Sequence, residues 1–196
     1  MNVPDLMFDR SNGYEKNADT FIRSRNPRIG LDVVRDWAGQ LTPGAEVLEL
    51  GCGHGVVSEV LVEAGLTLFA IDASPALLRA FHERFPNVET ECRAAEESKF
   101  FGRTFDGVVA WGLLFLLEED GQRCVLAKVG EALRPGGRFL FTAPREAVEW
   151  IDVMTELPSR SLGAVEYEQV LRGLGLDVSS GATDEGGNYY YLATKR

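Results

Sequence analysis

The strongest structural signal in this chain is the segment V-L-E-L-G-C-G-H-G at residues 47–55. Apolar residues around Glu49 predict a buried strand, and three glycines at alternate positions predict a tight turn. Apolar residues resume at Val56 and predict a helix directly after the turn. Glycine permits positive φ angles and close approach of a ligand, and a helix N-terminus offers free N–H groups. The segment is therefore typical of the first βα turn of a nucleotide-binding α/β domain.

The spacing of the glycines indicates which nucleotide is bound. The dinucleotide fingerprint G-x-G-x-x-G requires its third glycine one residue later, where this chain has Val56. Glu49 would repel a pyrophosphate, but a carboxylate at this position suits a ligand with a cationic amino group. The segment resembles motif I of the class I S-adenosylmethionine-dependent methyltransferases, which reads strand-E-x-G-x-G-x-G. An NAD-binding domain and an ordinary glycine turn are the alternatives for this motif alone.

Further segments follow in the order that this family shows. A predicted strand at 66–71 ends at Asp72, T-F-D-G-V-V-A at 104–110 resembles the family's F-D-x-V segment, and L-R-P-G-G-R-F-L-F follows at 133–141. A predicted hairpin closes the chain. The resemblance covers residues 44–196 and implies a Rossmann-like α/β fold. It implies a seven-stranded sheet in the order 3-2-1-4-5-7-6, with strand 7 antiparallel and helices on both faces.

Hydrophobic periodicity and turn residues predict the individual elements. Residues 144–161 show the least clear pattern. We expect one domain over residues 1–196, with a helical cap at 1–43 and the core at 44–196. The predicted helices are 14–24, 29–41, 54–64, 76–85, 118–133 and 167–174, and the predicted strands are 47–50, 66–71, 88–92, 104–110, 138–142, 176–180 and 189–194.

The resemblance implies S-adenosyl-L-methionine as cofactor and S-adenosyl-L-homocysteine as product. Asp72 follows the second predicted strand, where a carboxylate can accept hydrogen bonds from both ribose hydroxyls. It could also cap the next helix, although Ser74 is available for that role. The cofactor-binding candidates on the core are Glu49, Gly51, Cys52, Gly53 and Gly55 for the methionine part, Asp72 and Ala73 for the ribose, and Ala95 and Glu96 for the adenine.

Two further cofactor candidates precede the core, because the N-terminal extension of this family covers the cofactor. Tyr14 and Arg25 could reach the carboxylate end of the cofactor, and packing or a solvated charge is the alternative for each. Trp111, after the fourth predicted strand, could contact the cofactor, line the acceptor pocket or belong to the core. The substrate-binding candidates are Phe115, Trp150 and Asp152.

No catalytic residue is assigned from the sequence. A base is needed only if the acceptor loses a proton before attack. His54 in the glycine turn is a weak candidate, and Tyr14, Asp152 and Tyr190 are no better supported. The three cysteines are scattered without a C-x-x-C pair, so neither a metal site nor disulfides are expected.

Composition limits the partners. The 196 residues carry 20 basic and 30 acidic side chains, a net charge of −10, which disfavours a general grip on nucleic acid. No apolar run reaches the roughly 18 residues of a membrane span, and the first ten residues lack a signal-peptide pattern. We therefore expect a cytoplasmic protein that binds neither membrane nor nucleic acid. The sequence does not indicate the oligomeric state.

The sequence leaves the methyl acceptor open. No N-P-P-Y-type segment follows the fourth predicted strand, which disfavours the methylases of protein glutamine and DNA adenine. We expect methyl transfer to a small molecule, on oxygen, nitrogen or sulfur. The alternative is a catalytically inactive S-adenosylmethionine-binding regulatory or scaffold protein.

Overall fold

A mixed eight-stranded sheet organises the structure, a computed structural model that describes residues 9–24 and 29–196. The strand order is β3-β2-β1-β4-β5-β10-β8, and β9 pairs with the same edge of β10 as β8 does. β10 is antiparallel to its neighbours, so the predicted order and orientation are confirmed. The strands are β1 (Glu46–Leu50), β2 (Thr67–Asp72), β3 (Glu89–Cys92), β4 (Phe105–Ala110), β5 (Leu133–Thr142), β8 (Leu176–Val178), β9 (Ala182–Thr183) and β10 (Tyr189–Lys195).

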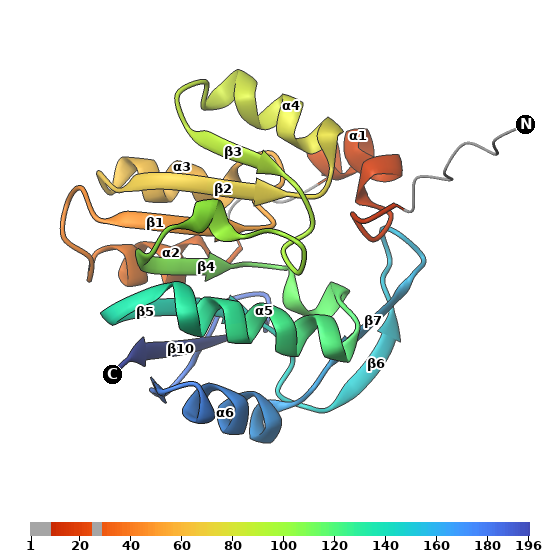
Figure 1. Cartoon of the computed structure of the whole chain (residues 1–196). Coiled ribbons are helices and arrows are strands. Elements are labelled where there is room, and N and C mark those ends of the chain that lie inside the picture. Colours follow the sequence, from red (N-terminus) through yellow and green to blue (C-terminus); the bar gives the residue numbers. More distant parts are fainter. Residues whose placement is uncertain (1–8, 25–28) are drawn as a thin grey trace, which may run out of the picture.

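Helices cover both faces of the sheet, as predicted (Figure 1). α2, α3 and α4 share one buried cluster that includes Val34, Val57 and Phe81. α5 and α6 contribute Leu126 and Leu171 to the cluster on the other face. The central strands are therefore buried on both sides, which explains their nearly continuous apolar sequences. The helices are α1 (Tyr14–Ser24), α2 (Leu31–Ala38), α3 (Val56–Glu63), α4 (Pro75–Arg84), α5 (Glu119–Ala132) and α6 (Ala164–Gly173).

Local sequence sets where the helices beside the sheet's carboxyl edge begin. α3 begins at Val56, later than the predicted start at residue 54, because Gly53 and Gly55 have positive φ angles of 55° and 88°. α4 begins at Pro75, whose fixed φ suits the first helical position. Ser74 caps this helix through its side-chain oxygen, as the sequence allowed.

The segment L-R-P-G-G forms an interruption within β5. Phe105 pairs with Leu133, whereas Gly107 pairs with Arg138, so the register shifts between the two pairs. Residues 134–137 therefore bulge from the ladder, and the predicted strand from Arg138 is its continuous part.

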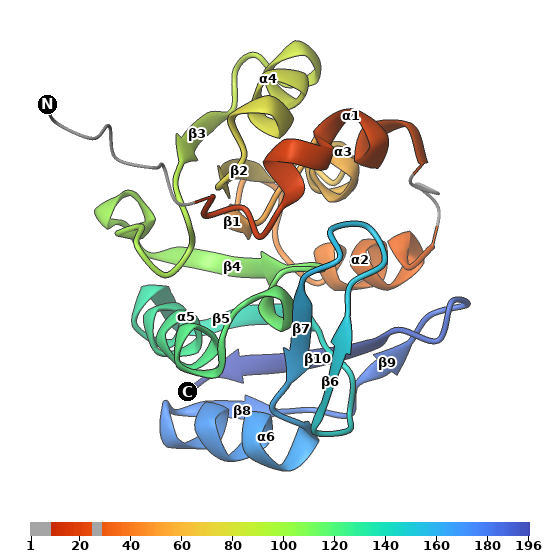
Figure 2. The same ribbon diagram turned by 90° about the vertical axis from the view of Figure 1, so that its right-hand side faces the viewer.

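Residues 144–161, the stretch of unclear pattern, contain a separate two-stranded hairpin. Its strands are β6 (Val148–Ile151) and β7 (Pro158–Ser161), which pair antiparallel. Figure 2 shows this hairpin extending from the sheet toward the N-terminal segment. At its tip, Thr155 and Leu157 pack closely around Gly13. The hairpin and the N-terminal segment thus meet at the carboxyl edge of the sheet.

Candidate active site

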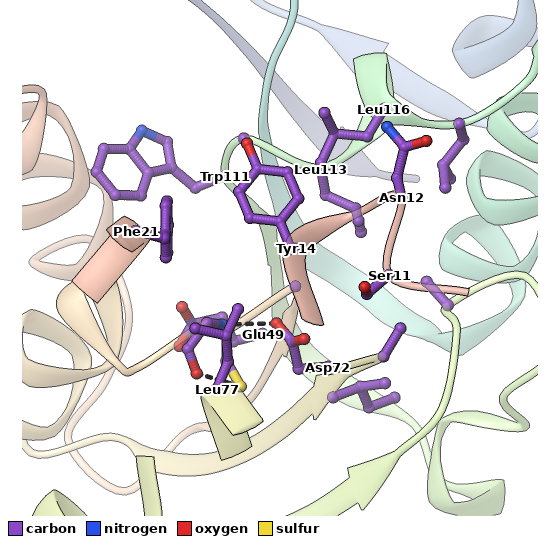
Figure 3. A pocket seen from close by; sticks show the side chains of 18 of the residues that line it. Ser11, Asn12, Tyr14, Phe21, Glu49, Asp72, Leu77, Trp111, Leu113 and Leu116 are labelled. Carbon is purple, nitrogen blue, oxygen red and sulfur yellow. Dashed lines mark hydrogen bonds between the residues drawn. The ribbon is translucent and has the colours of Figure 1, made fainter. Parts of the chain in front are cut away.

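A pocket of about 450 Å³ lies at the carboxyl ends of β1, β2 and β4 (Figure 3). Open α/β sheets bind their ligands at this edge, and the volume lies in the usual range of small-molecule sites. Of the residues proposed from the sequence, all but four line this pocket. Gly55, Trp150 and Tyr190 do not line it, and Arg25 lies outside the described residues.

The glycine turn is fixed to the end of β2. The N–H groups of Gly51 and Cys52 donate to the carbonyl of Ile71, at 2.8 and 3.1 Å. The N–H of Gly53 donates to Oδ2 of Asp72 at 2.7 Å. Asp72 therefore connects the two motifs that the sequence shows separately, and any ligand at the turn also meets this carboxylate.

Two buried carboxylates form the floor of the pocket. Oδ1 of Asp72 accepts from the N–H of Ser74 at 2.8 Å, and burial raises the pKa of Asp72 although hydrogen bonds from backbone N–H groups oppose the rise. Oε2 of Glu49 accepts from the hydroxyl of Ser58 at 2.5 Å. A carboxylate has about four lone-pair sites and can accept several hydrogen bonds. The floor thus suits hydroxyl and ammonium donors.

Gly55 has a packing role. An added Cβ there would lie 2.4 Å from the ring of Phe85, at the end of α4, and its φ of 88° disfavours other residues. The third glycine of the motif therefore allows the turn to pack against α4 rather than facing the pocket.

The turn after β3 forms one side of the pocket. The N–H groups of Glu97 and Ser98 both donate to the carbonyl of Ala94, at 3.0 Å, and close the turn. Within the described part of the chain, the Oε2 atom of Glu96 is buried and has no hydrogen-bond partner. A buried acceptor without a donor costs about 1–3 kcal/mol, so this atom indicates a ligand that donates here. The residues present therefore fit an adenine-bearing cofactor.

The N-terminal segment covers the pocket opposite this floor. Figure 3 shows Tyr14 and Phe21 on the side away from Glu49 and Asp72. The rings of Tyr14 and Phe21 meet edge to face at 5.1 Å, and Phe21 meets His54 of the glycine turn at 5.6 Å. α1 therefore rests directly on the predicted cofactor loop.

Polar contacts of two side chains, Glu15 and Arg10, hold this cover in place. Oε2 of Glu15 accepts from the hydroxyl of Ser74 at 2.5 Å and from the N–H of Ala76 at 2.9 Å, at the N-terminus of α4. Arg10 pairs with Glu97 at 3.1 Å, on the turn after β3. The start of the described chain is thus anchored on both sides of the pocket.

Trp111 forms the wall at the end of β4. Its indole N–H donates to the hydroxyl of Tyr190 at 2.7 Å, and that hydroxyl donates to Oδ2 of Asp184 at 2.9 Å. Burial and the nearby Asp184 raise the pKa of Tyr190, so this phenol is neutral and is unsuited to act as a base. Hydrogen bonds from Asn188 and Tyr190 lower the pKa of Asp184 despite its burial, so it stays a charged acceptor.

The predicted acceptor residues occupy different positions. Phe115 lines the pocket, and Trp150 packs behind it with a ring distance of 5.6 Å. Asp152 lines the pocket at the hairpin tip, but its Oδ1 accepts from the N–H groups of Met154 and Thr155, at 2.9 and 2.8 Å. The hydrogen bonds to Oδ1 of Asp152 therefore stabilise the turn at the hairpin tip.

Cys52 offers no nucleophile. Burial, together with the nearby Asp72 and Glu49, raises the pKa of its thiol well above the usual range. The thiol stays protonated at neutral pH and acts as a small apolar residue of the turn.

Several residues that line the pocket were not predicted from the sequence, including Asn12, Leu113, Thr142, Met154 and Asn188. Asn12 has a positive φ of 51°, and its Nδ2 is buried without a hydrogen-bond partner among the described residues. The Asn-Gly turn signal at residues 12–13 indicated the backbone but not the ligand-facing side chain. Leu113, Met154 and Asn188 come from loops whose placement depends on tertiary packing, and Thr142 is the last residue of β5.

Comparisons with known proteins agree with this architecture. A family model described as a methyltransferase domain matches residues 47–137. An uncharacterised methyltransferase of Mycobacterium tuberculosis is 31% identical over 132 residues, which cover 64% of this chain and 51% of that protein. The demethylmenaquinone methyltransferase of Paenarthrobacter aurescens is 29% identical over 149 residues, 71% of this chain and 58% of that protein.

A solved structure shows the same fold over the whole chain. It is the 1,6-didemethyltoxoflavin-N1-methyltransferase of Burkholderia thailandensis, with bound 1,6-didemethyltoxoflavin and S-adenosylhomocysteine. Its TM-score is 0.73 at 20% identity, and the match covers 100% of this chain and 93% of that one.

The chain spans little more than half the length of the two curated relatives described above. In the segments that the structure describes, no helix combines the length and apolar character needed to cross a bilayer. The region matched by the family model contains the glycine turn, the end of β2 and the turn after β3. This match and the sheet order agree: the chain contains a methyltransferase domain and has the fold of the class I S-adenosylmethionine-dependent methyltransferases, the family whose cofactor is S-adenosylmethionine.

Proposed function

We propose that this protein transfers the methyl group of S-adenosylmethionine to a small-molecule acceptor. The observation that carries the proposal is one pocket that joins two buried carboxylates and the glycine turn to a wall of aromatic side chains. Glu49 and the turn would hold the methionine part, Asp72 and Ala73 the ribose, and Ala95 and Glu96 the adenine. S-adenosylmethionine supplies an activated methyl group on its sulfonium.

The protein itself would position the cofactor and the acceptor and enclose them in the pocket. The floor carboxylates and the turn fix the cofactor, while Trp111, held by Tyr190, fixes the opposite wall. Such positioning can supply roughly 7–11 kcal/mol of a reaction barrier. The cover of Tyr14 and Phe21 excludes water, a competing nucleophile. No residue needs to act as a nucleophile in a direct transfer.

The shape of the pocket and the net charge of the chain favour a small molecule as the methyl acceptor. The pocket suits a small molecule, its far side carries Trp111, Phe115 and Met154, and the net charge of −10 disfavours a polyanion. The Paenarthrobacter relative is named for a demethylated menaquinone, and the Burkholderia structure contains a demethylated toxoflavin. We propose an acceptor of comparable, ring-containing type. If a base is used, His54 stays the weak candidate.

The helical cap at 1–43 is proposed as a cover, from the contacts that α1 makes to the glycine turn and to α4. The division of the chain into this cap and a core at 44–196 stays a prediction from the sequence. The cytoplasmic location also stays a prediction from the sequence.

Ligand-dependent melting tests the proposed cofactor. S-adenosylhomocysteine at a hundredfold excess over its Kd should stabilise the protein by about 2.7 kcal/mol, and NAD should not. A shift with NAD alone, or with neither ligand, would contradict the proposal. Incubation of small ring-containing acceptors with S-adenosylmethionine, followed by detection of S-adenosylhomocysteine, then separates an enzyme from an inactive binding protein.

A further inference from the structure

Lys128 of α5 contacts the turn after β3 from behind the pocket. Its Nζ donates to the carbonyls of Glu96 and Ser98, at 2.5 and 2.8 Å, and lies 3.5 Å from the carbonyl of Ala95. An ammonium group has three donors, so Lys128 directs all of them to one short turn. Lys128 does not line the pocket.

These contacts fix the direction of the peptide groups in the turn. A trans peptide places its N–H opposite its carbonyl. Because the Ala95 carbonyl faces Lys128, the N–H of Glu96 points away from Lys128. Among the described residues, no backbone carbonyl accepts from the N–H groups of Ala95 and Glu96. The turn therefore keeps N–H donors available beside a pocket that both residues line.

The side chain of Glu96 adds the complementary group. Its Oε2 atom is buried and has no hydrogen-bond partner in the described ranges, 9–24 and 29–196. An N–H donor beside a carboxylate acceptor matches the edge of adenine, which offers the N1 acceptor beside the N6 amino donor. The same N–H and carboxylate would disfavour hypoxanthine, because hypoxanthine has a donor at N1 and an acceptor at position 6.

We propose that Lys128 is a positioning residue that determines which base the pocket accepts. It holds the turn after β3 so that the N–H donor and the Oε2 acceptor of Glu96 face adenine. Without the ammonium group, the peptide between Ala95 and Glu96 can rotate and present its carbonyl instead. This inference rests on the proposed function, since it requires an adenine-bearing cofactor in this pocket.

The test compares two ligands by calorimetry: S-adenosylhomocysteine and its deaminated analogue, S-inosylhomocysteine. The wild type should prefer the adenine ligand. In Lys128→Met, affinity for S-adenosylhomocysteine should fall about tenfold, as for loss of about one oriented hydrogen bond. Affinity for the inosine analogue should change by less than about threefold, so the preference for S-adenosylhomocysteine over S-inosylhomocysteine becomes smaller. A purely structural role would weaken both ligands equally.

Matched variants complete the test. Arg123→Met removes a positive charge from the same helix, where Arg123 pairs with Glu119 and Glu166, and it should keep the wild-type preference. Lys128→Arg should restore most of that preference, and Lys128→Gln replaces Lys128→Met if the latter does not fold. An unchanged preference in the Lys128 variants overturns this inference alone. Failure of the wild type to bind S-adenosylhomocysteine overturns the proposed function and the inference with it.

Discussion

Asp72 has two tasks, because the same carboxylate braces the glycine turn and faces the pocket. Asp72→Asn should weaken S-adenosylhomocysteine binding by about 10–100-fold, since an amide replaces one charged acceptor and such bonds contribute about 1.5–3 kcal/mol. Isothermal titration calorimetry measures the change. Burial raises the pKa of Asp72, so its ionised form opposes folding at neutral pH. Asp72→Asn removes this charge but leaves one of the N–H groups of Gly53 and Ser74 without its acceptor, so the ligand-free melting temperature reports two opposing effects and the affinity alone reports the binding role.

A second aspartate provides the control for this prediction. Asp106 lies near the amino end of β4, away from the pocket, and pairs with Arg134 at 2.8 Å. Asp106→Asn should lower the melting temperature and leave the ligand affinity unchanged. Equal affinities of wild type and Asp72→Asn would remove Asp72 from the proposed site.

Tyr190 acts on the pocket through Trp111. Tyr190→Phe removes the hydroxyl that accepts from the indole N–H of Trp111 in a half-buried hydrogen bond, which should cost about 0.5–1.5 kcal/mol. We expect a lower melting temperature and a raised KM for the acceptor, with S-adenosylhomocysteine affinity within about twofold of wild type. Tyr189→Phe, at the neighbouring position, is the matched control. A large loss of cofactor affinity would instead place Trp111 in the cofactor wall.

At the residue scale, the sequence predicted the groups that stand at strand ends. Glu49 and Asp72 follow directly from apolar strand patterns, and the parallel topology brings them together. Asn12 and Lys128 could not be predicted in this way. Each depends on a loop or helix packing against a distant segment, and neither residue type is unusual at its place in the sequence.

At the scale of elements, Glu15 provides the hydrogen bonds that join α1 to the start of α4. Glu15→Ala removes the acceptor for Ser74 and Ala76 at the start of α4. We expect amide exchange in residues 10–24 to accelerate and S-adenosylhomocysteine affinity to fall about three- to tenfold, because the cover opens more often. Hydrogen exchange with mass spectrometry measures the first effect and calorimetry the second.

Lys16 offers a control on the same helix. Its side chain is exposed, so Lys16→Ala should change neither exchange nor affinity. If Glu15→Ala accelerated exchange without any effect on binding, α1 would be a covering element with no part in holding the ligand.

The elements themselves were predictable to different degrees. Helical spacing located α1 with its observed bounds, and the parallel strands follow from apolar runs between turn residues. The β6–β7 hairpin was missed because its strands are only four residues long and lack strict alternation. Tertiary contacts hold it, such as Trp150 against Phe115 and Leu157 against Gly13.

At the scale of the whole molecule, the two edges of the sheet have opposite electrostatic designs. The carboxyl edge holds Asp72, whose pKa is raised by burial, in the proposed binding site. The amino edge holds Glu46 and Asp106, which share Arg134. The carboxyl edge thus carries an unfavourable buried charge at the proposed site, whereas ion pairs stabilise the amino edge.

This difference predicts the acid response of the protein. Hydrogen bonds from Arg134 and Arg103 lower the pKa of Glu46 from its ordinary 4.5, and the bond from Arg134 lowers that of Asp106 from 3.8 against a desolvation effect. The native state therefore binds fewer protons than the unfolded chain. The resulting stability is complete above these ordinary values and is lost as the pH falls through them to the lower native values.

Arg134→Met should flatten the acid limb of the stability curve. Between about pH 6 and pH 3, the wild type should lose more unfolding free energy than the variant, and the two should converge at the acid end. Urea titrations at each pH measure this. Arg35→Met, which breaks an exposed pair on α2, should keep the wild-type slope because such pairs contribute little. Parallel curves for wild type and Arg134→Met would show that carboxylates elsewhere govern acid unfolding.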